Sequence, residues 1–255
     1  MRWGDIGYVI GAVISLPFLP FLYWQGKRIR AKVPELPEAE GPEGIVKEVG
    51  EPLQVVVIGE STMAGVGVAT HAEGFAGSFG AAMAEATKQE VRWKVYAKGG
   101  YTAARVVEKL VPEIIEAEID WIVVGLGGND AFKFNSPWRW RAAMHHLIQA
   151  LRQRFPNTPI VFANMPPIRD FPAFPPLIQW LIGNQVELLG RELKTVVQHY
   201  PNVYYNAEVI TFKGWIKRYE LEGEIDVFFS DGVHPSQLTY EIWAKDLVNY
   251  CGTEI

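Results

Sequence analysis

The decisive stretch of the sequence reads Val55-Val56-Val57-Ile58-Gly59-Glu60-Ser61-Thr62-Met63-Ala64-Gly65. Its four β-branched apolar residues predict a strand that is buried on both faces. The strand ends at Gly59, and a polar turn punctuated by glycine follows. Ligands of open α/β sheets bind just beyond the carboxyl ends of the strands. Ser61 therefore lies where a nucleophile would be useful, although a serine after a strand is also a common helix cap.

Strands and helices alternate along the rest of the chain. The sequence predicts strands at 53–58, 91–97, 121–124, 159–163 and 203–205. Helices are expected over 71–87, 102–117, 136–155, 176–198 and 236–249. This alternation is typical of a doubly wound sheet with helices on both faces. We therefore predict an α/β fold around a mostly parallel, five-stranded sheet.

Composition excludes several classes of protein. Hydrophobic residues make up 49% of the 255 residues and charged residues 21%, as in an ordered globular chain. The net charge of −5 gives no sign of the basic face that nucleic-acid binding requires. Cys251 is the only cysteine, so the chain forms no internal disulfide and no cysteine-rich metal site. The histidine spacings typical of zinc sites are also missing from the sequence, and we expect neither a metal nor a cofactor.

The N-terminus carries an uncharged stretch over residues 6–24, which is about the length that crosses a bilayer core as a helix. We predict that residues 1–26 form a hydrophobic anchor helix in a membrane, with the rest of the chain on the cytoplasmic side. A cleaved signal peptide, which would make the protein periplasmic or secreted, and a soluble hydrophobic arm are the alternatives. Residues 27–52, basic and then acidic and proline-rich, are expected to link the anchor to a domain over 53–255.

A second polar loop, Ser230-Asp231-Gly232-Val233-His234-Pro235-Ser236, precedes the last predicted helix. A tight turn at Gly232 would bring the Asp231 carboxylate to Nδ1 of His234. That contact would fix the imidazole tautomer and leave Nε2 free to activate Ser61. A capping aspartate beside a surface histidine is the alternative interpretation of this loop.

Two glycine-rich turns, Lys98–Thr102 and Gly125–Asp130, follow the second and third predicted strands. In a parallel sheet both turns lie at the same edge as Ser61. A tetrahedral oxyanion needs hydrogen-bond donors arranged around it in advance. A glycine N–H and the Asn129 amide would supply such donors, and glycine allows close approach. Taken singly, each loop also reads as an ordinary tight turn between strand and helix.

Four blocks of sequence thus occur in order: Gly-x-Ser at 59–61, glycine at 99–100, Gly-x-Asn-Asp at 127–130, and Asp-x-x-His at 231–234. Together they resemble the SGNH, or GDSL-type, serine hydrolases over about residues 50–250. The resemblance implies a flavodoxin-like sheet and hydrolysis of esters through an acyl-enzyme.

Carried over residue by residue, the resemblance makes Ser61 the nucleophile, His234 the base and Asp231 its orienter. The Ser61 N–H, the Gly100 N–H and the Asn129 side chain would form the oxyanion hole. Glu60 departs from the family pattern, which usually has aspartate before the serine, one methylene shorter. This departure leaves a catalytically silent scaffold as an alternative.

Substrate contacts are expected from the apolar, proline-stiffened connection between Asn164 and Gly183 and from the helix after the Asn129 loop. We predict Phe171, Phe174 and Trp138 as walls of an acyl pocket. A lipid-like or other acyl ester is the substrate that these residues favour. The alternatives are a glycan O-deacetylase or acyltransferase with the same triad, and a ligand-binding module without catalysis.

Overall fold

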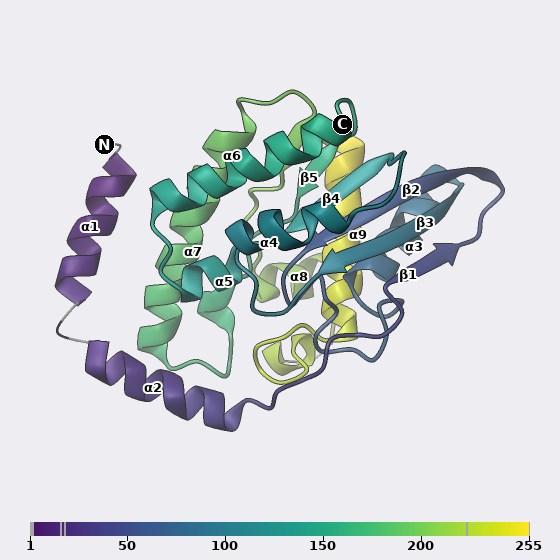
Figure 1. The fold of residues 1–255 in the computed structure, drawn as a ribbon. Helices are drawn as coiled ribbons and strands as arrows, with labels where there is room; N and C mark the ends of the chain where they lie inside the picture. The colour runs from purple at the N-terminus through teal and green to yellow at the C-terminus, as the bar shows by residue number, and fades with distance from the viewer. Residues whose placement is uncertain (1–2, 16, 18, 223, 255) are drawn as a thin grey trace.

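The computed structural model describes residues 3–15, 17, 19–222 and 224–254 (Figure 1). Its strands are β1 (Glu43–Val46), β2 (Gly50–Gly59), β3 (Gln89–Ala97), β4 (Trp121–Gly125), β5 (Ile160–Phe162) and β6 (Val203–Tyr205). Its α-helices are α1 (Trp3–Ser15), α2 (Leu19–Lys32), α3 (Phe75–Thr87), α4 (Ala103–Lys109), α5 (Gly128–Phe132), α6 (Pro137–Arg154), α7 (Pro176–Val197), α8 (Phe212–Arg218) and α9 (Gln237–Glu254). Three short 3-10 helices are η2 (Val111–Glu113), η3 (Ile168–Asp170) and η4 (Ile225–Phe228).

The six strands form a sheet in the order β1-β3-β2-β4-β5-β6. All neighbours pair in parallel except β1, which pairs antiparallel with β3 at one edge. From β2 the chain passes first to β3 on one side and then to β4 on the other. The carboxyl ends of β2 and β4 therefore flank the point where the winding reverses, which is where open α/β sheets bind ligands.

Alternate side chains of β2 enter two different cores. Val56 and Ile58 pack with residues of α4, α6 and α7, whereas Val55 and Val57 pack with residues of α3 and α9. Figure 1 shows α4 on one side of the sheet and α9 on the other. All four side chains are at most 2% exposed. Burying a side chain of this size stabilises a fold by about 1.5–3 kcal/mol, so β2 is central to both cores.

The predicted α/β sheet is confirmed, and the structure adds the short helices α5 and α8 to the predicted elements. The five predicted strands are present as β2 to β6, and β1 adds a sixth from within residues 27–52. The helix predicted over 102–117 is shorter, because α4 ends at Lys109 and a 3-10 turn containing Pro112 follows. Proline has no N–H to continue an α-helix.

The prediction of a membrane anchor is wrong. Residues 1, 2, 16 and 18 of that segment lie outside the described residues; of the rest, α1 ends at Ser15 and α2 begins at Leu19. Among the residues that the structure describes, no helix has both the length and the apolarity to cross a bilayer. Pro17 lies between the two helices and Pro20 in the first turn of α2, positions where the missing N–H of proline suits a helix start rather than an interior. The predicted membrane localisation depended on a single long helix and is therefore also wrong.

Polar contacts attach α1 to the helices that cover the sheet. The Arg141 guanidinium on α6 pairs with Asp5 of α1 at 2.9 Å and with Glu192 of α7 at 2.8 Å. The Tyr8 hydroxyl donates to the Phe134 carbonyl at 2.6 Å. A buried carboxylate such as Asp5 requires a cationic partner, so this ion pair accounts for an acidic residue in an otherwise apolar helix.

Candidate active site

Four of the predicted site residues line one cavity, namely Ser61, Asn129, Phe171 and His234. Gly59 at the end of β2 lies in register with Gly125 at the end of β4. Ser61 follows two residues after Gly59, and Asn129 follows in the first turn of α5. Both line a cavity of about 220 Å³ whose wall also includes His234. The sheet thus brings Ser61, Asn129 and His234 together from positions far apart in the sequence.

Asp231 makes three hydrogen bonds within its own loop, two of them with His234. The carboxylate Oδ2 lies 2.8 Å from His234 Nδ1. The other oxygen, Oδ1, accepts the backbone N–H groups of Val233 at 2.9 Å and His234 at 2.7 Å. Burial raises the pKa of Asp231, but the hydrogen bonds from the side chain and backbone of His234 outweigh this effect and hold the pKa below its ordinary value. An ionised Asp231 thus accepts the Nδ1 proton, and Nε2 is left as the basic nitrogen.

Glu60 joins the loop after β2 to the loop after β4. Its Oε1 accepts the Gly128 N–H at 2.7 Å, and its Oε2 accepts the Asn129 N–H at 2.9 Å. The residue is 5% exposed. Burial raises the pKa of Glu60 to about 7, helped by the nearby charge of Asp130, although the two N–H groups act in the opposite direction. The longer side chain therefore reaches both N–H groups and fixes Asn129 beside Ser61.

The loop that contains Gly100 is tied to α5. Asn129 Nδ2 donates to the Tyr101 carbonyl at 3.0 Å, and the Ala103 N–H donates to Asp130 Oδ2 at 2.8 Å. Gly100 adopts a positive φ of 76°, which glycine tolerates best. Of the described residues, the cavity wall includes Ser61 and Asn129 but not Gly100. These contacts order the loop next to the site without making Gly100 part of the wall.

The profile of the GDSL-like lipase/acylhydrolase family matches residues 57–242, which span all four sequence blocks. The chain belongs to this family. It is accordingly a hydrolase that acts on ester bonds, and the resemblance drawn from the sequence is confirmed. Among curated protein sequences, none matches the chain significantly.

Solved structures agree with the family assignment at the level of the fold. A lipase from a goat rumen metagenome superposes with a TM-score of 0.60 at 18% identity, covering 78% of this chain and 97% of its own. An acetyl-xylooligosaccharide esterase from Geobacillus gives 0.58 at 14% identity, covering 81% and 97%. A lipase/acylhydrolase from Enterococcus faecalis gives 0.54 at 18% identity, covering 79% and 96%. These proteins share the fold of this GDSL-like hydrolase.

The predicted substrate-binding residues of this GDSL-like hydrolase lie in three different places. Phe171 lines the cavity. Phe174 lies behind it, with its ring 5.7 Å from that of Phe171 and 5.5 Å from that of Phe132, which also lines the cavity. Trp138 is 44% exposed and packs edge-on against Tyr8 of α1 at 5.6 Å. The connection over Pro166–Phe171 thus contributes to the wall, whereas Trp138 contacts the N-terminal helix.

Sequence reasoning missed one deeply buried part of the wall. We call it the inner wall; its members are apolar and at most 6% exposed, namely Ile210, Phe212, Trp215 and Trp243. They come from the segment after β6, from α8 and from α9. The only signal in the sequence is a concentration of aromatic residues around α8, which a hydrophobic core would also produce. Among the described residues, no cluster of three His, Cys, Asp or Glu side chains is arranged to bind a metal.

Gly232 is the turn residue that brings Asp231 to His234, and its replacement by alanine should destabilise the loop. Its φ is 83°, and an added Cβ would lie 3.1 Å from the Ala173 Cβ and 3.3 Å from the Ala173 nitrogen. We expect Gly232→Ala to lower the free energy of unfolding by about 1–2 kcal/mol, the cost of a left-handed conformation for a non-glycine residue. Urea denaturation measures this change. Gly252→Ala, in open space on α9, is the matched control, and equal midpoints for both variants would contradict the strain argument.

Proposed function

We propose that this GDSL-like hydrolase cleaves carboxylic esters through an acyl-enzyme on Ser61. His234 serves as the base and Asp231 as its orienter. The observation that carries the proposal is that Ser61 and His234 line the same cavity while Asp231 Oδ2 engages His234 Nδ1 at 2.8 Å. An imidazole held at Nδ1 in this way keeps Nε2 free to take the proton of the serine.

In the proposed reaction, Ser61 Oγ attacks the ester carbonyl carbon and His234 Nε2 accepts the hydroxyl proton. The resulting oxyanion receives hydrogen bonds from the Ser61 N–H, the Gly100 N–H and the Asn129 amide. Collapse of the intermediate breaks the bond to the alcohol oxygen, which takes the proton from His234. A water molecule then attacks the acyl-enzyme by the same route, releasing the carboxylic acid and regenerating Ser61.

The wall of the cavity supports an acyl chain as the part of the substrate that enters it. Apart from Ser61, Asn129 and His234, most of its members are apolar, and the largest are Phe132, Phe171, Phe212, Phe229, Trp215 and Trp243. Such a lining favours a hydrocarbon over a hydroxylated sugar, because burying apolar surface is favourable and burying unpaired hydroxyls is not. A lipid-like or other acyl ester is therefore preferred over an acetylated glycan.

The test is covalent labelling of the full chain with a fluorophosphonate, which reacts with activated serines. We expect wild-type protein to be labelled and Ser61→Ala and His234→Ala to remain unlabelled. Ser78→Ala is the matched control, because Ser78 lies on α3 and is not part of the cavity wall, and it should label like wild type. Absence of labelling in folded wild-type protein would overturn the triad and favour a scaffold that binds without catalysis.

A further inference from the structure

The inner wall of the cavity is built by a segment that folds back between β6 and α9. Ile210, Phe212 and Trp215 come from this segment, and Trp243 comes from α9. Trp215 is 3% exposed, whereas Phe132, elsewhere on the cavity wall, is 40% exposed. Phe132 therefore lies on a side of the cavity that borders solvent, and Trp215 lies on a side that is closed by protein.

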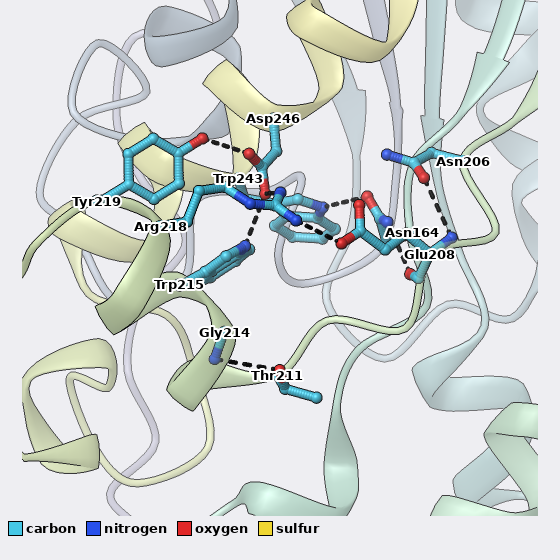
Figure 2. Close-up of polar contacts among 10 residues, drawn as sticks. All are labelled: Asn164, Asn206, Glu208, Thr211, Gly214, Trp215, Arg218, Tyr219, Trp243 and Asp246. Carbon is cyan, nitrogen blue, oxygen red and sulfur yellow. Dashed lines mark hydrogen bonds and ion pairs between the residues drawn. The ribbon is translucent and has the colours of Figure 1, made fainter.

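One carboxylate on α9 holds α8 in place. Figure 2 shows three side chains of the α8 region converging on Asp246. The Trp215 indole N–H donates to Asp246 Oδ2 at 2.7 Å, Arg218 donates to the same oxygen at 3.1 Å, and the Tyr219 hydroxyl donates to Oδ1. Residues at spacings of three and four share one face of a helix, so all three donors point the same way. Hydrogen bonds to an ionised carboxylate are stronger than those between neutral groups.

A second set of contacts fixes the start of the same segment (Figure 2). Glu208 pairs with Arg218 at 2.7 Å, and its carbonyl accepts from Asn164 Nδ2 at 2.9 Å. Asn164 Oδ1 in turn accepts the Trp243 indole N–H at 3.3 Å. Both tryptophans of the inner wall therefore have their indole N–H bound to a protein side chain, Trp215 to Asp246 and Trp243 to Asn164, which is itself part of the cavity wall. Their apolar faces are left to meet whatever occupies the cavity.

We infer that Trp215 sets the longest acyl chain that the cavity accepts and that Asp246 is the positioning residue that holds Trp215 there. This inference rests on the proposed function, because it assumes that the acyl part of the ester enters the cavity. A rigid apolar end wall discriminates by length: a chain that stops short of Trp215 fits, and a longer one must displace a buried indole. A single methylene in an apolar pocket changes kcat/KM by about 10- to 200-fold, so the position of this ring has a measurable effect.

The experiment compares kcat/KM for p-nitrophenyl butanoate, octanoate and dodecanoate among variants of the full chain. We expect Trp215→Ala to raise the dodecanoate-to-butanoate ratio by about tenfold or more, and Trp215→Phe to raise it less, because phenylalanine refills part of the space. Asp246→Ala should also raise the dodecanoate-to-butanoate ratio, because Trp215 is still present but its indole N–H has lost its acceptor. Asp246→Asn should restore part of the wild-type ratio through the remaining amide oxygen.

Arg218→Ala is the matched control. It removes two ion pairs of α8 but leaves the contact between Trp215 and Asp246 intact. We expect this variant to unfold at lower urea concentration with an unchanged chain-length ratio. A ratio that shifts equally in Arg218→Ala and Asp246→Ala would reduce Asp246 to a general structural role and overturn its assignment as a positioning residue.

A binding measurement separates this inference from the proposed function. In a Ser61→Ala background, displacement of a fluorescent fatty acid by butanoic, octanoic and dodecanoic acid reports chain length without catalysis. A shift toward dodecanoic acid on adding Trp215→Ala supports the inference even if wild-type protein hydrolyses no ester, in which case the proposed function alone fails. Unchanged profiles in both assays, or no binding of any chain, would overturn the inference.

Discussion

Replacing Asp231 by asparagine should lower kcat/KM for ester hydrolysis by about 10⁴-fold while leaving the fold intact. The backbone N–H groups of Val233 and His234 both donate to Asp231 Oδ1. These two donors require an oxygen at that position in the variant as well. The amide nitrogen of the new side chain must then take the Oδ2 position, which faces His234 Nδ1 at 2.8 Å.

An amide N–H at that position donates to Nδ1 and forces the imidazole proton onto Nε2. The nitrogen that should accept the Ser61 proton is then already protonated. Although asparagine has the shape of aspartate, the backbone contacts orient its amide so that His234 adopts the wrong tautomer. We therefore expect kcat/KM to fall by far more than the loss of one hydrogen bond would cause.

Steady-state kinetics with an acyl ester measure the loss. Asp226→Asn is the matched control, because Asp226 is exposed in the same part of the chain and should leave kcat/KM unchanged. In a His234→Ala background, Asp231→Asn should have no further effect, because an orienter acts only through the base. Losses that multiply in the double variant would mean that Asp231 acts independently of His234.

The strands that position the site could be predicted because their pattern is local. β2 is buried on both faces and reads as a continuous apolar run, and β3 to β6 follow at spacings that suit alternating helices. β1 could not be predicted in this way. Its side chains alternate between exposed and half-buried, and it lies among the acidic residues and prolines typical of a linker. Only its antiparallel pairing with β3, about fifty residues away in the chain, defines it as a strand.

The polar residues of the site could be predicted from the sequence because their chemistry depends on residue type and order. Ser61, Asn129 and His234 each stand in a short motif, and parallel strands bring such motifs to one edge of the sheet. The inner wall had no comparable signal. Phe212 and Trp215 look like core residues, and only the return of α8 onto α9, fixed by Asp246, places them in the cavity.

The partner of Trp138 was equally invisible in the sequence. Proximity to Asn129 along the chain suggested an acyl pocket, but the ring packs against Tyr8, 130 residues earlier. The long apolar N-terminal segment has the hydropathy of a membrane helix but does not form one, for a related reason. Hydropathy measured the length of the segment, whereas two prolines and the Asp5–Arg141 ion pair determine how it folds.

Replacing Glu60 by glutamine should remove a pH dependence from the stability of the protein. Burial is the largest cause that raises the pKa of Glu60 from 4.5 to about 7. Because the pKa is higher in the folded state than in the unfolded chain, the folded state binds more protons between these two values. The contribution of neutral Glu60 to stability is therefore complete below about pH 4.5 and is lost as the pH rises to about 7. The gap between the two pKa values corresponds to about 3 kcal/mol of unfolding free energy.

Glutamine has the size of glutamate and stays neutral throughout. Near pH 5, Glu60→Gln should be less stable than wild type by about 1 kcal/mol, because the amide nitrogen cannot accept the backbone N–H that it faces, whereas a protonated carboxyl keeps lone pairs on both oxygens. At pH 8 the absence of a buried negative charge outweighs this cost, and the variant should be more stable than wild type by about 1–2 kcal/mol. Urea denaturation of both proteins at the two pH values measures the difference. Glu113→Gln, at an exposed glutamate, is the control and should show no such change.

The opposite result at pH 8 would be equally informative, because two physical effects compete at Glu60. The N–H groups of Gly128 and Asn129 approach its two oxygens at 2.7 and 2.9 Å, a geometry that favours the ionised form. If wild type were the more stable protein at pH 8, these hydrogen bonds would outweigh burial, and Glu60 would be an anion that fixes the Asn129 loop. If the variant is more stable, the glutamate that this chain has in place of the family's aspartate is a neutral acid beside Asn129 at low pH and destabilises the loop as it ionises.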